Sequence, residues 1–261
     1  MTNERPKMTS VAHVSEIVFT IQFPRISIAT VLDMANFFEL RKDKFPLLQQ
    51  VPRLGPIDPK MPELADPSQM QLGFTDASLP RVWLISSDGM RVIQLQDDRL
   101  GFNWRRVDPL DRSDPYPGYV ALKQEFADLY AEFSSWCENR FGAAPKPNAG
   151  DLSYTNAIPL QDEKGPKRIS EILSFFSPRM KRQINGFQMG WMERLSGKAP
   201  GYLTMQATVG ALVTGPSVVV LNFVSRVDLK DAGNDVSSWF DNAHNQTLEL
   251  FSQALISGTE C

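Results

Sequence analysis

The order of the predicted strands and helices is the feature that most constrains how this chain can fold. In residues 14–23, apolar side chains such as Ile17 and Phe19 alternate with polar ones such as Glu16 and Thr20, which is typical of a half-buried strand. The elements predicted after it are a helix at 27–40, strands at 81–86, 90–96 and 99–107, and a long amphipathic helix at 118–141. The first half therefore runs strand, helix, three strands, long helix.

The same order returns in the second half, although the two halves share little sequence. The elements predicted there are a strand at 151–159, a short helix at 169–176, strands at 185–195, 202–213 and 217–227, and a helix at 234–256. Strands that follow one another directly favour antiparallel pairing, with helices covering one face. We therefore expect an α+β fold of two similar halves, with their sheets joined edge to edge about a pseudo-twofold axis.

Composition at the junctions suggests where the halves begin and end. Residues 1–12 look like a flexible lead, and the first half occupies residues 13–142. Residues 143–150 (AAPKPNAG) are typical of a linker to the second half, at 151–261. Within the first half, the proline-rich residues 45–80 predict a long, mostly irregular excursion. A loop of this length is unusual in a compact domain and is often functional or disordered.

The overall charge and the apolar runs narrow the classes of function. The net charge is −3, from 27 basic and 30 acidic residues, so nothing draws the whole chain to nucleic acid or to an anionic membrane. Apolar runs such as Val218–Leu221 are far shorter than the roughly 20 residues of a membrane span. The polar N-terminus lacks a signal-peptide pattern, and only Cys137 and Cys261 carry thiols. We expect a cytoplasmic protein without membrane contact, metal or cofactor.

Catalytic motifs are absent from the sequence. It has no phosphate-binding glycine loop, no HExxH and no GxSxG. Of its two histidines, His13 lies at a strand start and His244 on the last helix, and either could serve a Ser–His–Asp site because triads are spatial. Ordinary polar surface or boundary positions are the favoured interpretation for both. Asp97 and Asp98 are interpreted as a turn, since aspartate favours turns.

A mixture of aromatic, amide and arginine side chains on neighbouring predicted strands suggests an interaction surface. Such groups can contact phosphates, base edges or protein carboxylates, and they are also common anchors of protein interfaces. The candidates are Arg81, Trp83, Gln94, Gln96, Arg99, Asn103, Trp104, Arg105 and Arg106. The alternative is that Trp104 is core and the arginines are solvated or paired within the fold, because an amphipathic strand needs a polar outer face.

Several short blocks resemble a family of sporadically distributed, uncharacterised bacterial proteins of about this length. The blocks are Val14–Phe19, Phe45-Pro46, Arg81–Ser86, Gln94-Leu95-Gln96, Asn103-Trp104-Arg105, Tyr116-Pro117-Gly118-Tyr119, Tyr154-Thr155-Asn156 and the last helix around Trp239 and His244. The resemblance spans nearly the whole chain, and the Asn-Trp-Arg block is its most specific part. It implies a bacterial cytosolic protein and brings no catalytic residues. The patchy distribution suggests mobile accessory genes, such as defence or toxin–antitoxin loci. Independently of this resemblance, the residues Tyr116–Tyr119 are most simply interpreted as the start of a helix, with Tyr119 packed inward.

Three hypotheses of function follow. The first is a non-enzymatic binding or accessory subunit that engages a protein partner, encoded nearby, through the sheet face and the proline-rich loop. The second is nucleic-acid binding, which requires the arginines of the candidate strands on one accessible surface and predicts strong salt dependence. The third is an enzyme or small-molecule binder with a cavity between the sheet and the long helix. For the third hypothesis the pocket candidates are Tyr154, Asn156, His244 and Asn103.

Overall fold

The structure is a computed structural model, and it describes residues 13–26, 29–58, 79–113, 115–162, 165–177, 179, 186–197, 201–211, 217–229 and 236–256.

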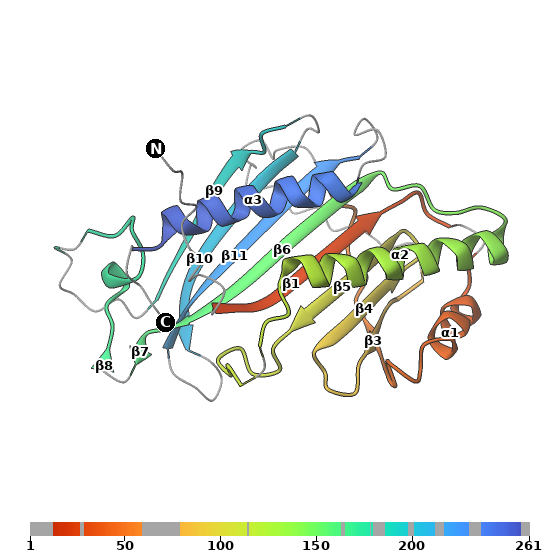
Figure 1. Cartoon of the computed structure of the whole chain (residues 1–261), viewed down its shortest axis with the longest axis horizontal. Helices are drawn as coiled ribbons and strands as arrows, with labels where there is room; N and C mark the ends of the chain where they lie inside the picture. Colours follow the sequence, from red (N-terminus) through yellow and green to blue (C-terminus); the bar gives the residue numbers. More distant parts are fainter. Residues whose placement is uncertain are drawn as a thin grey trace, which may run out of the picture.

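The described residues form one nine-stranded antiparallel sheet (Figure 1). Its strands are β1 (Val14–Gln22), β2 (Leu47–Val51), β3 (Arg81–Ile85), β4 (Arg91–Gln96), β5 (Arg99–Arg105), β6 (Ala149–Pro159), β9 (Phe187–Arg194), β10 (Gly201–Ala211) and β11 (Ser217–Asp228). They lie in the order β2-β3-β4-β5-β1-β6-β11-β10-β9. The prediction of an α+β fold with an antiparallel sheet is therefore confirmed.

Strands β1 and β6, which begin the two predicted halves, pair with each other at the centre of the sheet. From this pair the first half continues outward as β5, β4 and β3, and the second half as β11, β10 and β9. Strand β1 keeps the predicted alternation: Ile17, Phe19 and Ile21 are fully buried, while Glu16 and Val18 point to the other face and are only partly covered.

Two long helices, α2 (Tyr119–Phe141) and α3 (Val236–Ala254), lie over the same face of the sheet (Figure 1). Phe19 on β1 contacts both of them, because its ring lies 5.6 Å from that of Phe126 on α2 and 5.3 Å from that of Phe240 on α3. A shorter helix, α1 (Val31–Glu39), contacts α2 where Phe37 meets Phe133, with ring centres 5.5 Å apart. Among the described residues, no helix combines the length and the apolar character needed to span a membrane.

Local sequence explains where these helices begin and end. Thr30 caps α1 through a capping box with Asp33, and residues 27–28, at the start of the helix predicted for 27–40, lie outside the described residues. Helix α2 begins after Gly118 and ends at Gly142, and both glycines adopt a positive φ, of 91° and 81° respectively. This conformation is costly for residues with a Cβ, so the two glycines delimit the helix.

Some predicted boundaries are wrong. Residues 47–51 form strand β2 within the segment expected to be irregular, so four strands rather than three follow α1. Strand β6 begins at Ala149, inside the predicted linker, because Ala149 and Gly150 continue the ladder with β1 and β11. The short helix predicted in the second half is a 3-10 turn, η2 (Ile169–Glu171), preceded by a small hairpin of β7 (Gln161–Asp162) and β8 (Gly165–Pro166).

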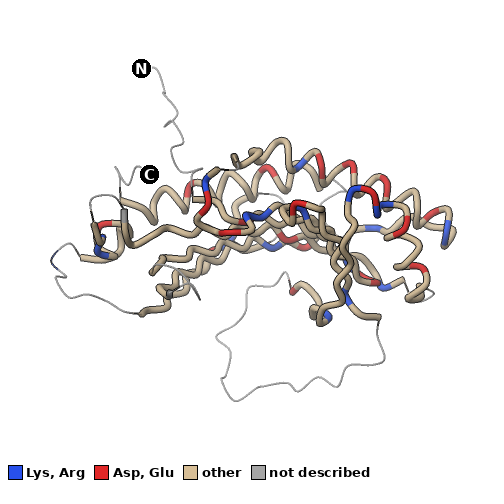
Figure 2. Tube along the Cα trace, turned by 90° about the horizontal axis from the view of Figure 1, so that it is seen from below, with Lys and Arg blue, Asp and Glu red and all other residues tan. Residues whose placement is uncertain are grey.

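Residues 53–58, which we call the strap, lie on the face of the sheet opposite the long helices (Figure 2). Their backbone is bound by side chains of the sheet. The amide of Leu54 donates to Gln96 Oε1 at 3.0 Å, and Gln96 Nε2 donates back to the carbonyl of Leu54 at 3.1 Å. The amide of Ile57 donates to Gln22 Oε1 at 2.6 Å. This part of the predicted excursion is therefore fixed on the sheet by side-chain amides.

Candidate functional site

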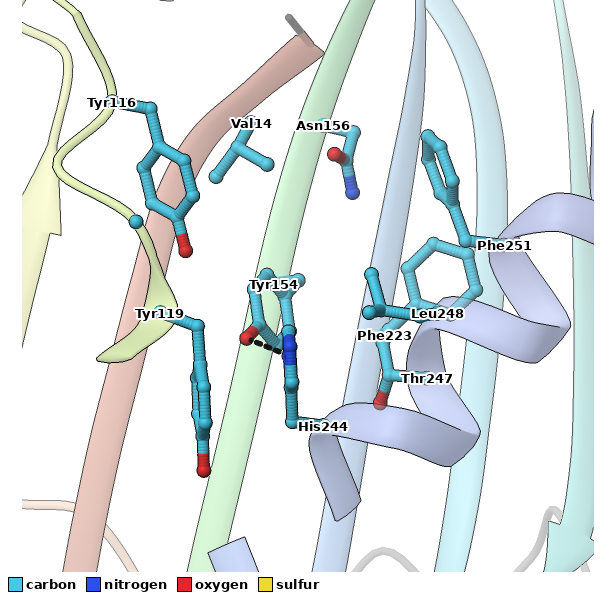
Figure 3. Close-up of a pocket in the computed structure, with 11 residues that line it drawn as sticks. Val14, Tyr116, Tyr119, Tyr154, Asn156, Phe223, His244, Thr247, Leu248 and Phe251 are labelled. Atoms are coloured by element: carbon cyan, nitrogen blue, oxygen red, sulfur yellow. Dashed lines mark hydrogen bonds between the residues drawn. The ribbon is translucent and has the colours of Figure 1, made fainter. Parts of the chain in front are cut away.

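A pocket of about 150 Å³ lies between the long helices and the centre of the sheet (Figure 3). It is formed by β6 and β11, by the start of α2 with the loop before it, and by the middle of α3. The residues that line it are Val14, Tyr116, Gly118, Tyr119, Tyr154, Asn156, Phe223, His244, Thr247, Leu248 and Phe251. Most of them are apolar or aromatic, and none of them carries a carboxylate, an ammonium or a guanidinium group.

The pairing of the strands explains why these side chains meet. Tyr154 on β6 lies between Ile17 on β1 and Phe223 on β11, all three on the face that the helices cover. Because side chains on one face of a strand recur every second residue, Asn156 points the same way as Tyr154. His244 reaches the same space from α3. The pocket candidates Tyr154, Asn156 and His244 are therefore brought together by the structure.

Tyr154 and His244 form the main hydrogen bond of the pocket, with 2.7 Å between the hydroxyl oxygen and Nδ1. Burial lowers the pKa of His244 to about 4, so the ring is neutral near pH 7. Burial also raises the pKa of the Tyr154 hydroxyl, which keeps its proton. With both groups neutral, the tautomer of His244 sets the direction of this hydrogen bond: the hydroxyl donates to Nδ1 when the ring proton is on Nε2, and it accepts when the proton is on Nδ1.

Tyr119 forms a second contact with His244 at the edge of the pocket. The two rings stack with their centres 3.8 Å apart and their planes 4° from parallel. The Tyr119 hydroxyl donates to Asp241 at 3.0 Å, and Lys123 pairs with the same carboxylate at 2.7 Å. The charged groups Lys123 and Asp241 near the pocket are thus paired with each other, next to the Tyr119 hydroxyl.

Two polar groups in the pocket are poorly satisfied by the protein. The hydroxyl of Tyr116 is buried and makes no hydrogen bond of ordinary geometry in the described part of the chain; the Tyr154 hydroxyl is its polar neighbour and lies close enough to interact with it. The side-chain amide of Asn156, a residue only 3% exposed, makes one long contact in the described part of the chain, 3.5 Å from Nδ2 to the carbonyl of Leu221. Buried polar groups are normally hydrogen-bonded, so each of these is available to a bound molecule.

This chemistry suits binding better than proton transfer. A general acid or base works best with a pKa near the operating pH, and burial moves the pKa values of His244 and Tyr154 away from neutrality in opposite directions. Within the described part of the chain, His, Cys, Asp and Glu side chains do not gather in groups of three or more that could hold a metal ion.

Trp104 and Arg106, two interaction candidates, support a wall of the pocket. Trp104 is 1% exposed, and its ring contacts that of Tyr116 edge to face at 5.2 Å. Arg106 lies over the Trp104 ring at 5.3 Å and donates through Nε to the carbonyl of Val14 at 3.1 Å. The Asn-Trp-Arg and Tyr-Pro-Gly-Tyr blocks, which a loop separates in the sequence, thus meet through Trp104 and Tyr116.

The remaining interaction candidates lie on the opposite face of the sheet. Gln94 accepts from Arg81 at 2.8 Å and from Trp83 at 3.2 Å, and it donates to Asn103 at 2.6 Å. Asn103 in turn donates to Glu16 at 2.7 Å. Asn103 therefore does not belong to the pocket: strand alternation places it on the face opposite Trp104, so that pocket candidate was wrong.

Many of the candidates are not exposed. Gln96 and Arg99 are bound to the strap, where Arg99 donates to the carbonyl of Gly55 and to Gln22. Arg105 is partly covered and donates to the carbonyl of Gly89 at 3.1 Å. The candidates with buried side chains are Gln96, Arg99, Asn103, Trp104 and Arg106. The predicted interaction surface is smaller than expected, because neighbouring strands and the strap make hydrogen bonds with these side chains and cover them.

Other functional residues were missed or misjudged from the sequence. Tyr116 and Tyr119 were interpreted as a helix start, although they supply one wall of the pocket; their position in a resembling block was the only signal. His13 is buried, with 3% exposure, rather than at the surface or boundary, and burial lowers its pKa to about 4. Neither protein-family models nor curated proteins give a match to this chain, so the family resemblance stays a prediction.

Proposed function

We propose that this protein binds a small, uncharged and largely apolar molecule in the pocket between its long helices. The observation that carries the proposal is an aromatic pocket in which a buried hydroxyl, that of Tyr116, makes no hydrogen bond of ordinary geometry within the described structure. Ligand sites are typically apolar and contain a few polar groups that orient the ligand. The pocket combines both properties.

The size of the pocket limits the ligand. A cavity of 150 Å³ in a protein core can hold a molecule the size of benzene, and this pocket has about that volume. The pocket is only partly enclosed, so a longer molecule would place one end inside and the other in solvent. The absence of charged groups from the lining disfavours an ionic end inside, because an unpaired charge is costly to bury.

Filling the pocket tests this proposal. Leu248→Trp adds a large ring to the α3 side of the pocket, and we expect it to abolish binding of small aromatic fragments detected by ligand-observed NMR. Leu32→Trp is a matched control, since Leu32 on α1 is 77% exposed and lies outside the pocket. Thermal unfolding of both variants checks that they are folded. Fragment binding that is equal in wild type and in Leu248→Trp would refute the proposal.

We also infer that the pocket lies at the junction of two similar halves with a shared layer of helices on one face of the sheet. The support is the strand order, which runs outward from β1 and β6 in the same sequence of elements, and the position of α2 and α3 at the end of each half. The first half would then be residues 13–142, and the second would begin at residue 149 rather than 151.

The two other hypotheses stay predictions. Nucleic-acid binding needs Arg81, Arg99, Arg105 and Arg106 on one accessible surface, whereas Arg99 and Arg106 are 6% and 7% exposed. A protein partner could still meet the partly exposed Trp83 and Arg105, and the bacterial, cytoplasmic and accessory-gene setting is likewise a prediction. Neither hypothesis has a geometric feature as specific as the pocket.

A further inference from the structure

The Tyr116 hydroxyl sits where a ligand could replace a missing hydrogen bond. Tyr116 comes from the loop before α2, and its ring is held by Trp104 on β5 at 5.2 Å. In Figure 3 its hydroxyl points toward Tyr154 across the pocket. A buried hydroxyl without a partner costs free energy, so a bound group that accepts or donates a hydrogen bond there is favoured.

Asn156 provides a second orienting group, on the floor of the pocket. Its amide offers both donors and an acceptor, and its one contact within the described chain is the long one to Leu221. A hydroxyl or a carbonyl oxygen of a ligand can accept from both Tyr116 and Asn156. Only a hydroxyl can also donate to the side-chain oxygen of Asn156, so it uses more of the hydrogen-bonding groups that the pocket offers.

The walls of the pocket select a flat ring. Tyr154 and Phe223 come from the sheet, and Phe251 and His244 come from α3. Aromatic rings favour edge-to-face and offset-stacked contacts with a ring of the ligand, in addition to the area that they bury.

We propose that the ligand is an uncharged aromatic ring that carries a hydroxyl group, a phenol-type compound, oriented by the Tyr116 hydroxyl and the Asn156 amide. This inference rests on the proposed function, because it specifies the ligand of the same pocket. The ring occupies the aromatic walls, and the hydroxyl replaces the hydrogen bonds that the protein leaves unmade. Any longer substituent extends through the open side of the pocket.

Four probes at pH 7 separate the parts of the proposal: phenol, benzene, cyclohexanol and benzoate, each titrated by calorimetry or ligand-observed NMR. We expect phenol to bind about tenfold more tightly than benzene, as one additional satisfied hydrogen bond predicts. Cyclohexanol should bind more weakly than phenol, and benzoate should not bind because its charge has no partner in the lining.

Tyr116→Phe should reduce the ratio of the affinities for phenol and benzene several-fold. Because the hydroxyl makes no hydrogen bond of ordinary geometry within the described protein, the variant is expected to fold as the wild type does. Tyr130→Phe is the control, since the Tyr130 hydroxyl donates to the carbonyl of Pro145, outside the pocket. Asn156→Leu is a second variant that should also weaken phenol more than benzene.

The outcomes distinguish the two proposals. If no probe binds in a way that Leu248→Trp prevents, both fail. If benzene and phenol bind equally, if cyclohexanol matches phenol, or if benzoate binds best, the pocket is a ligand site but the phenol-type assignment is wrong. Loss of benzene binding in a folded Tyr116→Phe variant would also overturn the assignment, since it would assign a packing role to the residue.

Discussion

The two faces of the central sheet are built by different means. On the face covered by α2 and α3, aromatic side chains pack against one another, and Phe19 alone contacts Tyr119, Phe126 and Phe240. On the opposite face, polar side chains of neighbouring strands are linked by hydrogen bonds, as in the contact between Asn103 and Glu16. Strand alternation predicts on which face of the sheet each side chain lies, but it does not predict whether the polar side chains on that face are exposed to solvent.

The difference matters for function. Packing of apolar surface is non-directional and tolerates a small unfilled volume, so the helix-covered face can contain a pocket. Hydrogen-bonded side chains leave few groups free, and burying them unpaired is costly. The helix-covered face is therefore better suited to hold a ligand, whereas the polar face requires a hydrogen-bond partner for each group that it buries.

The largest effect should come from breaking the aromatic face. Phe19→Ala removes a fully buried ring at the point where both long helices meet the sheet, and we expect a loss of about 4 kcal/mol in the free energy of unfolding. Chemical denaturation measures it. Val18→Ala, the adjacent residue on the other face, is the control and should cost much less. Equal losses for the two variants would contradict the contrast between the faces.

A polar group within the aromatic face should make stability depend on pH. The folded pKa of His244 is about 4 and its ordinary value is 6.5, so between these values the unfolded chain binds a proton that the folded chain does not. The stability from neutral His244 is full above pH 6.5 and is lost as the pH falls toward 4, by up to about 3 kcal/mol.

Comparison of the wild type with His244→Gln separates the contribution of His244 to the pH dependence of stability from that of other groups. The pKa of His13 is also lowered, whereas the raised pKa values of Asp151 and Glu16 act in the opposite direction. Denaturation at several pH values should show the wild type losing more stability than the variant between pH 6.5 and 4. Parallel curves would show that His244 is not the group that titrates.

A smaller effect is expected from the polar face. Asn103→Ala removes the donor to the Glu16 carboxylate and the acceptor of the Gln94 side-chain NH2 group, and we expect a loss of about 2 kcal/mol in the free energy of unfolding. The hydrogen bond from Asn103 lowers the pKa of Glu16 against the effect of burial, so that pKa should rise further in the variant, as NMR titration would show. Gln49→Ala on the exposed edge strand is the control. An unchanged Glu16 pKa would mean that the contact is not maintained in solution.

Much of the sheet could be predicted from the sequence because its strands alternate. Strand β2 could not, since residues 47–51 lack alternation and their pairing with β3 is a distant contact. Among pocket residues, Tyr154 and Asn156 share one face of a strand, and this is readable from spacing. Tyr116 was not recognised, because its role depends on contact with Trp104, and no local pattern records that contact.

The strap has a consequence for how the chain is made. The carbonyl of Asp58 accepts a hydrogen bond from the hydroxyl of Tyr202, which is 144 residues later in the chain. At a synthesis rate of roughly 5–20 residues per second, Tyr202 follows Asp58 out of the ribosome by about 7–30 s. During that interval the growing chain contains the strap but not the tyrosine that binds Asp58. This contact between the strap and β10 can therefore form only after most of the sheet has been synthesised.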